Sequence, residues 1–134
     1  MRSLKIKATV ENLDIVTDFL NEQLEETDCP VKTQMQIDLA AEEIFVNIAH
    51  YAYGDETGTA VISADISEGR AVITFEDCGI PYDPLAKPDP DITLAAEDRA
   101  VGGLGIFMVK KSMDDVRYEY RNGKNILTLV KRLV

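Results

Sequence analysis

The sequence predicts a two-layer α+β sandwich in which three helices cover one face of a mixed, mostly antiparallel sheet. Three observations support this fold class. The expected elements follow the order strand, helix, helix, strand, strand, helix, strand, strand. Two pairs of adjacent strands are separated by short hairpin turns. The chain has 134 residues, 46% of them hydrophobic, which suits one core and therefore a single domain over residues 1–134.

The first expected elements are a strand over residues 3–10 and a helix over residues 13–26. Apolar and polar residues alternate in the strand, as in a strand that is half buried. Asn12 is suited to cap the helix. The apolar residues of the helix recur at helical spacing: Leu13, Val16, Leu20 and Leu24.

A second helix is expected over residues 34–53. Thr33 and Gln36 have the spacing of a capping box, and Gly54 suits a C-terminal stop. Its apolar stripe consists of four residues: Ile37, Ala41, Ile44 and Ile48.

Four further strands and a third helix complete the predicted fold. The strands over residues 59–66 and 71–77 are separated by the hairpin-like "SEGR". The helix over residues 104–113 precedes strands at 116–121 and 126–133, and the Asn-Gly pair between these two strands is a strong hairpin signal.

Composition and charge exclude several classes of function. The net charge of −10 argues against nucleic acid or an anionic membrane surface as partner. The chain lacks an apolar run of the roughly 20 residues that a membrane span needs, and the N-terminus lacks a signal-peptide pattern, so a cytoplasmic protein is expected. Cys29, Cys78 and the lone His50 do not form a metal-ligand pattern, and the two cysteines are expected as reduced thiols.

The sequence "VGGLG" places three glycines directly before the third helix. Glycine lets backbone N–H groups approach a ligand closely, and a helix N-terminus favours an anion, so the run suits phosphate. Eight Lys and Arg residues against three Asp and Glu residues after position 98 also favour an anion here. The run matches neither the Rossmann nor the Walker pattern, and a hinge or a tight helix start is the alternative.

Glu43 and Asn47 lie four residues apart in the second helix, so their side chains point from the same side. A carboxylate beside phosphates can take a proton from a hydroxyl or position water, and an amide oxygen can ligate Mg²⁺. The same spacing is also common on solvated helix faces, which leaves that alternative open.

Asp77 ends a predicted strand, and the chain turns at once through Gly79. A carboxylate there can accept a hydrogen bond from the amine of adenine, whereas guanine offers an oxygen at that position. A fixed aspartate would therefore select ATP over GTP. The alternative is an ordinary turn. The following segment, residues 78–101, holds four of the five prolines and is too long for an ordinary connector, which indicates a functional loop or lid.

These three motifs, in this order, resemble the Bergerat ATP-binding fold of gyrase B, the MutL repair proteins, heat-shock chaperones and histidine kinases. The stretches "DCGIPYDP" and "GGLGIFMVKKSMDDVRYEY" are most similar to the stand-alone anti-sigma-factor serine/threonine kinases. The resemblance covers residues 33–134 and, with the first strand and helix, the whole chain.

The resemblance implies a role for each motif. Asn47 would bind Mg²⁺ and Glu43 would be the general base. Asp77 and Gly79 would read the adenine of ATP, and residues 78–101 would be the lid. The phosphates would be bound by the glycine run, which consists of Gly102, Gly103, Leu104 and Gly105. Arg99 and Lys110 would add positive charge.

The resemblance also implies partners, namely a small antagonist protein phosphorylated on serine, a sigma factor, and a second copy of the chain. One departure is that Tyr51 stands where many members of the family have a histidine, and His50 precedes it. Two alternatives to the kinase remain open: a nucleotide-gated protein-binding module and an ATP hydrolase.

Overall fold

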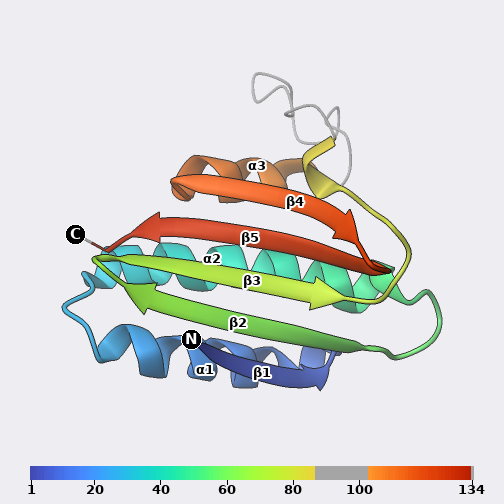
Figure 1. The fold of residues 1–134 in the computed structure, drawn as a ribbon, viewed down its shortest axis with the longest axis horizontal. Coiled ribbons are helices and arrows are strands. Elements are labelled where there is room, and N and C mark those ends of the chain that lie inside the picture. The colour runs from blue at the N-terminus through green and yellow to red at the C-terminus, as the bar shows by residue number, and fades with distance from the viewer. Residues whose placement is uncertain (87–102, 134) are drawn as a thin grey trace.

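The protein, described here by a computed structural model of residues 1–86 and 103–133, contains a five-stranded sheet of order β1-β2-β3-β5-β4. The strands are β1 (Arg2–Lys7), β2 (Thr59–Ser67), β3 (Arg70–Asp77), β4 (Asp115–Arg121) and β5 (Lys124–Arg132). The helices α1 (Leu13–Glu25), α2 (Val31–Asn47) and α3 (Gly103–Ser112) lie together behind the sheet in Figure 1. The predicted fold class is confirmed, and all the described strand pairs are antiparallel.

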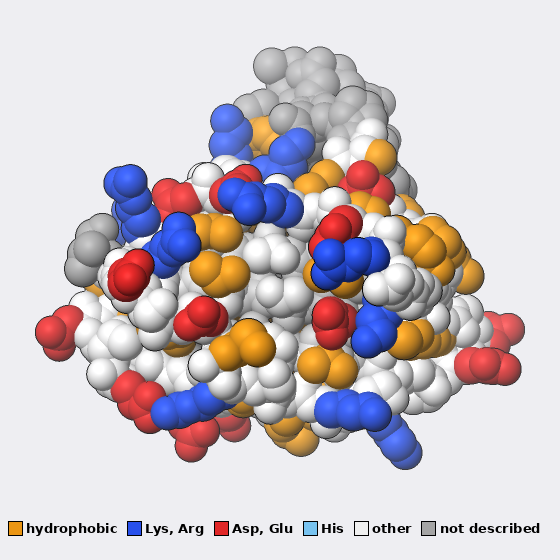
Figure 2. Space-filling model, in the orientation of Figure 1, with side chains coloured by type: hydrophobic (Ala, Val, Ile, Leu, Met, Phe, Trp, Pro, Cys, Tyr) orange, Lys and Arg blue, Asp and Glu red, His pale blue; other side chains and the backbone are white. Residues whose placement is uncertain are grey.

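The core lies between the sheet and the helix layer, in which α2 is flanked by α1 and α3. Alternating residues of β2 and β3 face this core, as the period of a strand requires. The largest fully buried side chains come from both layers: Phe45, Phe75, Leu20, Leu24, Ile37, Ile62, Ile73, Leu129 and Val16. The opposite face of the sheet carries hydrophobic side chains interspersed with charges of both signs (Figure 2).

Both predicted hairpins form with the backbone that their turn residues favour. Glu68 and Gly69 have φ values of 54° and 76°, and Asn122 and Gly123 have φ values of 54° and 77°. Positive φ at both central residues is typical of a type I′ turn, whose twist matches the strands on either side.

The predicted cap of α2 is wrong, and Asn12 stands at the N-cap of α1 as predicted but makes no side-chain cap bond. The α2 helix begins at Val31, because the carbonyl of Pro30 accepts the N–H of Gln34 at 3.0 Å. Pro30 is thus the N-cap, and no side chain makes a cap bond. Thr33 therefore lies inside the helix. The side chain of Asn12 donates instead to the Lys7 carbonyl at 3.0 Å, since Asn12 ends a 3₁₀ turn and lacks the extended backbone of an N-cap.

The second predicted helix is two elements. The α-helix ends at Asn47, and residues Ile48–Ala52 form a π-helical turn before the chain leaves through Gly54, whose φ is 61°. A π turn changes the direction of the side chains that follow it and is frequent at functional sites. The first strand is also shorter than predicted, because Val10 begins a 3₁₀ turn.

A polar contact joins α1 and α2 inside this layer. Gln34 donates from Nε2 to Oδ1 of Asn21 at 3.0 Å, and Asp38 lies beside it with a buried Oδ1 that accepts no hydrogen bond within the described residues. Burial raises the pKa of the Asp38 carboxyl; a hydrogen bond from Asn21 opposes this rise and the nearby charge of Glu25 adds to it.

Replacing Asp38 by asparagine is expected to stabilise the fold increasingly as the pH rises from about 4 to 7. Because the pKa of Asp38 is higher in the folded state than its ordinary 3.8, the folded chain holds more protons, and its stability falls as the pH rises above that value. The Asp38→Asn chain loses this dependence. Urea denaturation of both chains at several pH values measures the difference, with Asp18→Asn on the exposed face of α1 as control. A difference in stability that is constant with pH would contradict this account.

Candidate functional site

A pocket opens where the C-terminal end of α2 meets the ends of β3 and β5. The α2 end and the π turn contribute Asn47, Ile48 and Tyr51, and the sheet contributes Phe75, Asp77 and Leu127. The loop after β3 adds Tyr82 and Pro84. The pocket is thus mostly apolar with a few polar side chains, which is the usual composition of a small-molecule site.

Asp77 provides a buried carboxylate at this pocket, being only 6% exposed. Its Oδ1 accepts two hydrogen bonds of 2.9 Å, from the backbone N–H of Gly79 and from Nδ2 of Asn125. Its Oδ2 has no hydrogen-bond partner among residues 1–86 and 103–133. Oδ2 is therefore available to accept a hydrogen bond from a ligand.

Hydrogen bonds join the turn after Asp77 to the π turn and to Tyr53, the residue that follows the π turn. Ile80 donates its N–H to the Ala52 carbonyl at 2.9 Å. The Tyr53 hydroxyl accepts the Cys78 N–H at 2.8 Å and donates to the Thr59 carbonyl at 2.6 Å, and burial raises the pKa of this hydroxyl. A Cβ on Gly79 would lie 2.1 Å from the Ala52 carbonyl oxygen, so close approach to the backbone requires glycine there.

Glu43 and Asn47 do face the same side of α2, as their spacing predicts. Asn47 donates from Nδ2 to Oε1 of Glu43 at 3.3 Å. Because a carboxylate oxygen only accepts, the amide must turn its N–H₂ toward Glu43, which leaves its Oδ1 for another partner. Asn47 lines the pocket.

The glycine run reaches this pair from α3. A Cβ on Gly105 would lie 2.1 Å from Oε1 of Glu43. The carboxylate of Glu43 therefore occupies the space that a side chain at position 105 would fill. Gly103 and Leu104 form the first turn of α3. A carboxylate beside the first turn of a helix is in a favourable field, because the N-terminal N–H groups carry partial positive charge.

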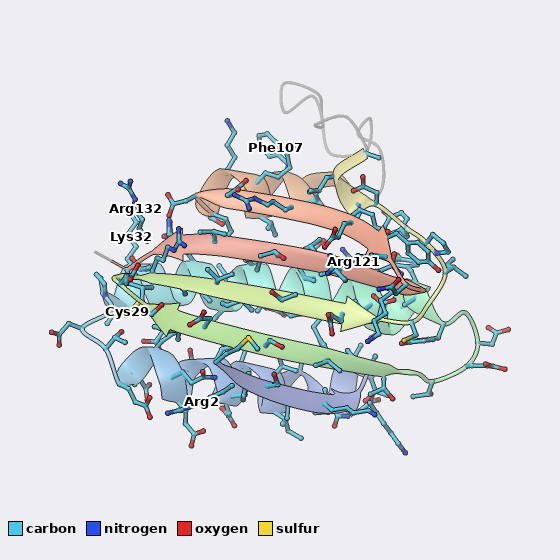
Figure 3. All side chains as sticks on the ribbon, viewed as in Figure 1. Arg2, Cys29, Lys32, Phe107, Arg121 and Arg132 are labelled. Carbon is cyan, nitrogen blue, oxygen red and sulfur yellow. The ribbon has the colours of Figure 1, made fainter. Side chains whose placement is uncertain are left out.

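Some of the predicted residues lie elsewhere or outside the described part of the chain. Arg99 and Gly102 lie outside it, as does the predicted lid after residue 86. Lys110 lies in the last turn of α3, about 10 Å along the helix axis from Gly103, and is not among the pocket residues. Its neighbour Lys111 lies over the ring of Phe107, 5.5 Å from the centroid; Figure 3 shows Phe107 on α3.

Three polar residues of the pocket were missed by the sequence prediction: Tyr82, Tyr118 and Asn125. Tyr82 belongs to the segment predicted as a lid, but no role was assigned to it. Asn125 follows the Asn-Gly hairpin and was interpreted as part of that turn, although it is only 7% exposed. The one sequence feature that could have indicated Asn125 as a pocket residue is an amide side chain two residues after the hairpin glycine, at the start of a strand.

Other classes of site receive no support within the described residues. Cys29 and Cys78 are free thiols there. The described ranges contain no cluster of three or more His, Cys, Asp or Glu side chains arranged to hold a metal ion. No helix in these ranges combines the length and apolar character needed to span a bilayer.

Comparison with known families identifies the fold. The model of the histidine kinase-like ATPase domain matches residues 6–131, nearly the whole chain. The chain belongs to this family. Membership implies that the domain uses ATP, in agreement with a pocket that offers a buried carboxylate and an α2 amide.

Curated relatives within the family are named serine-protein kinase RsbW. The protein from Bacillus cereus strain AH820 is 29% identical over 93 residues, which cover 66% of this chain and 58% of the relative. The protein from Listeria monocytogenes is 28% identical over 94 residues, which cover 66% of this chain and 60% of the relative. The chain therefore spans less than two thirds of the length of these relatives.

Solved structures agree on the fold. The structure of the RsbU and RsbW domains of Rv1364c from Mycobacterium tuberculosis matches 99% of this chain and 33% of that one, with a TM-score of 0.69 and 20% identity. The Acinetobacter baumannii histidine kinase AdeS matches 99% of this chain and 69% of its own, with a TM-score of 0.52 and 15% identity.

The two glycines of the site are expected to respond differently to replacement by alanine. Gly79→Ala would press against backbone and is expected to cost about 1–3 kcal/mol of stability. Gly105→Ala would press against the end of a flexible side chain, so it is expected to move the Glu43 carboxylate at a cost below about 1 kcal/mol. Urea denaturation measures the first effect, and the NMR signals of the Asn47 side-chain amide report the second.

Glu43→Ala and Glu42→Ala provide the matched comparison. Gly105→Ala should shift the Asn47 amide signals in the same direction as Glu43→Ala, because both changes remove the Glu43 contact. Glu42 is exposed on the same helix, and its replacement should leave those signals in place. Unchanged Asn47 signals in the Gly105→Ala chain would show that the carboxylate does not depend on this glycine.

Proposed function

We propose that this chain is an ATP-dependent serine/threonine protein kinase domain of the anti-sigma-factor type, whose site uses Mg-ATP and transfers the γ-phosphate to a serine of a small antagonist protein. The observation that carries the proposal is the buried Asp77, whose Oδ1 is occupied by two N–H donors and whose Oδ2 remains for a ligand. The relatives named serine-protein kinase support the type of reaction.

Adenine fits this acceptor because its exocyclic amine can donate to Oδ2. Guanine would bring a carbonyl oxygen to the same point, so two acceptors would face each other with no proton between them. A buried polar group left without its partner costs roughly 1–3 kcal/mol, which amounts to about a 5- to 150-fold preference. Gly79 would act with Asp77 by holding its carboxylate in this orientation.

The residues of α2 fit a magnesium ion. Mg²⁺ prefers oxygen ligands and is usually held by one or two protein oxygens together with phosphates. The amide of Asn47 directs its N–H₂ toward Glu43, so its Oδ1 is the oxygen that would hold the ion. Bound Mg²⁺ would neutralise charge on the phosphate oxygens during transfer.

Glu43 is the residue that we propose as general base. Its carboxylate is partly buried, is hydrogen-bonded by Asn47 and lies beside Gly105 at the first turn of α3. A carboxylate so placed can accept the proton of a serine hydroxyl as the oxygen attacks the γ-phosphate. The backbone amides of the glycine run would bind the phosphates; its residues are Gly102, Gly103, Leu104 and Gly105. We propose that Arg99 and Lys110 add positive charge.

The partners are part of the same proposal. The kinase would phosphorylate the antagonist and, in its other complex, hold a sigma factor inactive in the cytoplasm, with a second copy of the chain completing a homodimer and no nucleic acid or membrane bound. We propose residues 1–134 as one domain and residues 78–101 as its lid. A lid ordered by ATP would choose between the protein partners.

Calorimetric titration with ATP, ADP and GTP, with and without Mg²⁺, tests the nucleotide site. Adenine nucleotides alone should bind, and Mg²⁺ should increase the affinity for ATP. Asn47→Ala should lose the Mg²⁺ enhancement but keep binding of ADP without metal, because Asp77 is unaltered. The exposed Glu42→Ala on the same helix is the control. Absence of adenine nucleotide binding would overturn the proposed site.

Phosphate transfer tests the reaction itself. Glu43→Gln should lower transfer to the antagonist protein by about 10²- to 10⁴-fold, the usual contribution of a general base, while ATP still binds. If transfer is absent from the unaltered chain but ATP still regulates partner binding, the domain is a nucleotide-gated binding module. Phosphate release that needs no partner would identify an ATP hydrolase.

A further inference from the structure

Asn125 makes four hydrogen bonds with its side chain, which is the full capacity of an amide. Nδ2 donates to Oδ1 of Asp77 at 2.9 Å and to the Ile80 carbonyl at 2.9 Å. Oδ1 accepts the Tyr82 N–H at 3.1 Å and a hydrogen bond from the Tyr118 hydroxyl. One buried side chain thus contacts β3, β4 and the loop that follows β3.

Two backbone partners fix the orientation of this amide. The Tyr82 N–H can only donate, so it must face Oδ1, and the Ile80 carbonyl can only accept, so it must face Nδ2. The nitrogen of Asn125 is therefore the atom that faces Asp77, and Oδ1 of Asp77 must accept from it. A reversed amide would place acceptor against acceptor at Ile80 and donor against donor at Tyr82.

The same amide also fixes the loop relative to the carboxylate. Ile80 and Tyr82 are the third and fifth residues after Asp77, and Tyr82 and Pro84 both line the pocket. If these loop residues moved away, the amide would lose one donor contact and one acceptor contact, and its hold on Asp77 would weaken. The orientation of Asp77 and the position of the loop are thus joined through one side chain.

We propose that Asn125 is a positioning residue that sets the adenine selectivity of the site, by orienting Asp77 and by making that orientation depend on the loop at residues 80–82. This inference rests on the proposed nucleotide site and assigns it a specificity residue. With Oδ1 of Asp77 committed to Asn125 and Gly79, only Oδ2 can meet the base, and it meets the base as an acceptor. Loss of this constraint would let the carboxylate rotate and lower the discrimination between adenine and guanine.

Asn125→Asp tests the proposal because it keeps the shape of the side chain and removes its two donors. The new carboxylate would face Oδ1 of Asp77 and the Ile80 carbonyl without a proton. ADP affinity at pH 8 should fall at least 5-fold, the lower end of the cost of an unpaired buried group, and the ratio of ADP to GDP affinity should fall with it. Calorimetric titration with ADP and GDP measures both quantities.

The pH dependence separates this role from a merely structural one. Two carboxylates that share one site hold a proton, which restores one donor between them. The ADP affinity of the Asn125→Asp chain, relative to the unaltered chain at the same pH, should therefore recover as the pH is lowered from 8 to 6. The other titratable groups around position 125 are Asp77 on β3, Tyr118 and Tyr120 on β4, and Tyr82 and Asp83 in the loop. Asp77 shares the proton with the new carboxylate, whereas the remaining groups are common to both chains and their effects cancel in the ratio.

Tyr118→Phe provides a second variant if Asn125→Asp does not fold. It removes the hydroxyl donor to Oδ1 of Asn125 without touching Asp77, and it should lower the ADP to GDP ratio several-fold. Tyr120→Phe is the matched control, since Tyr120 lies on the same strand, directly opposite Asn125, and is 47% exposed. The next residue, Arg121, is the last of β4 and is labelled in Figure 3. The control should bind as the unaltered chain does.

The outcomes distinguish the inference from the proposed function. If the unaltered chain does not bind ADP, the proposed function is overturned and this inference with it. If the unaltered chain binds ADP selectively, and Asn125→Asp or Tyr118→Phe keeps the same selectivity without a new pH dependence, only the inference is overturned. A lower ADP to GDP ratio that recovers toward pH 6 in the Asn125→Asp chain would support it.

Discussion

The register between β3 and β5 is the constraint on which this end of the molecule depends. In that register Asp77 lies directly opposite Asn125, and the two side chains point to the same, buried face of the sheet. A shift of β5 by one residue would turn the side chain of Asn125 to the other face while Asp77 stayed in place. The carboxylate would then lose the amide, and the loop after β3 would lose two backbone hydrogen bonds that the same amide provides.

The rest of the site depends on where α2 and the π turn end relative to Asp77 and Asn125. The α2 helix stops at Asn47, the π turn directs Ala52 toward the loop, and the Ala52 carbonyl accepts the N–H of Ile80. Two glycines permit the remaining contacts, Gly79 against the backbone of Ala52 and Gly105 against the carboxylate of Glu43. The proposed base-reading carboxylate on the sheet and the proposed proton acceptor on the helix layer would suit a nucleotide that spans both layers.

The sequence predicted what depends on local chemistry. Hairpins with glycine at positive φ, apolar stripes at helical spacing and the pairing of Glu43 with Asn47 all follow from neighbours a few residues apart. Asn125 could not be predicted in the same way, because it contacts Asp77 across 48 residues and that contact requires the strand register. The contact of Gly105 with Glu43 likewise joins two helices distant in sequence. The cap of α2 was wrong because Pro30 starts that helix, and Asn12 lacks its cap bond because it ends a 3₁₀ turn.

The central claim is that Asp77 reads the base through an unpaired carboxylate oxygen, and Asp77→Asn tests it most directly. This change keeps the shape of the side chain and converts one acceptor into a donor, so the affinity for ADP should fall while GDP, whose carbonyl can accept from the new amide, should lose less or gain. Calorimetric titration of both nucleotides against both chains measures the two affinities. Equal loss of ADP and GDP, or unchanged binding of ADP, would contradict the account.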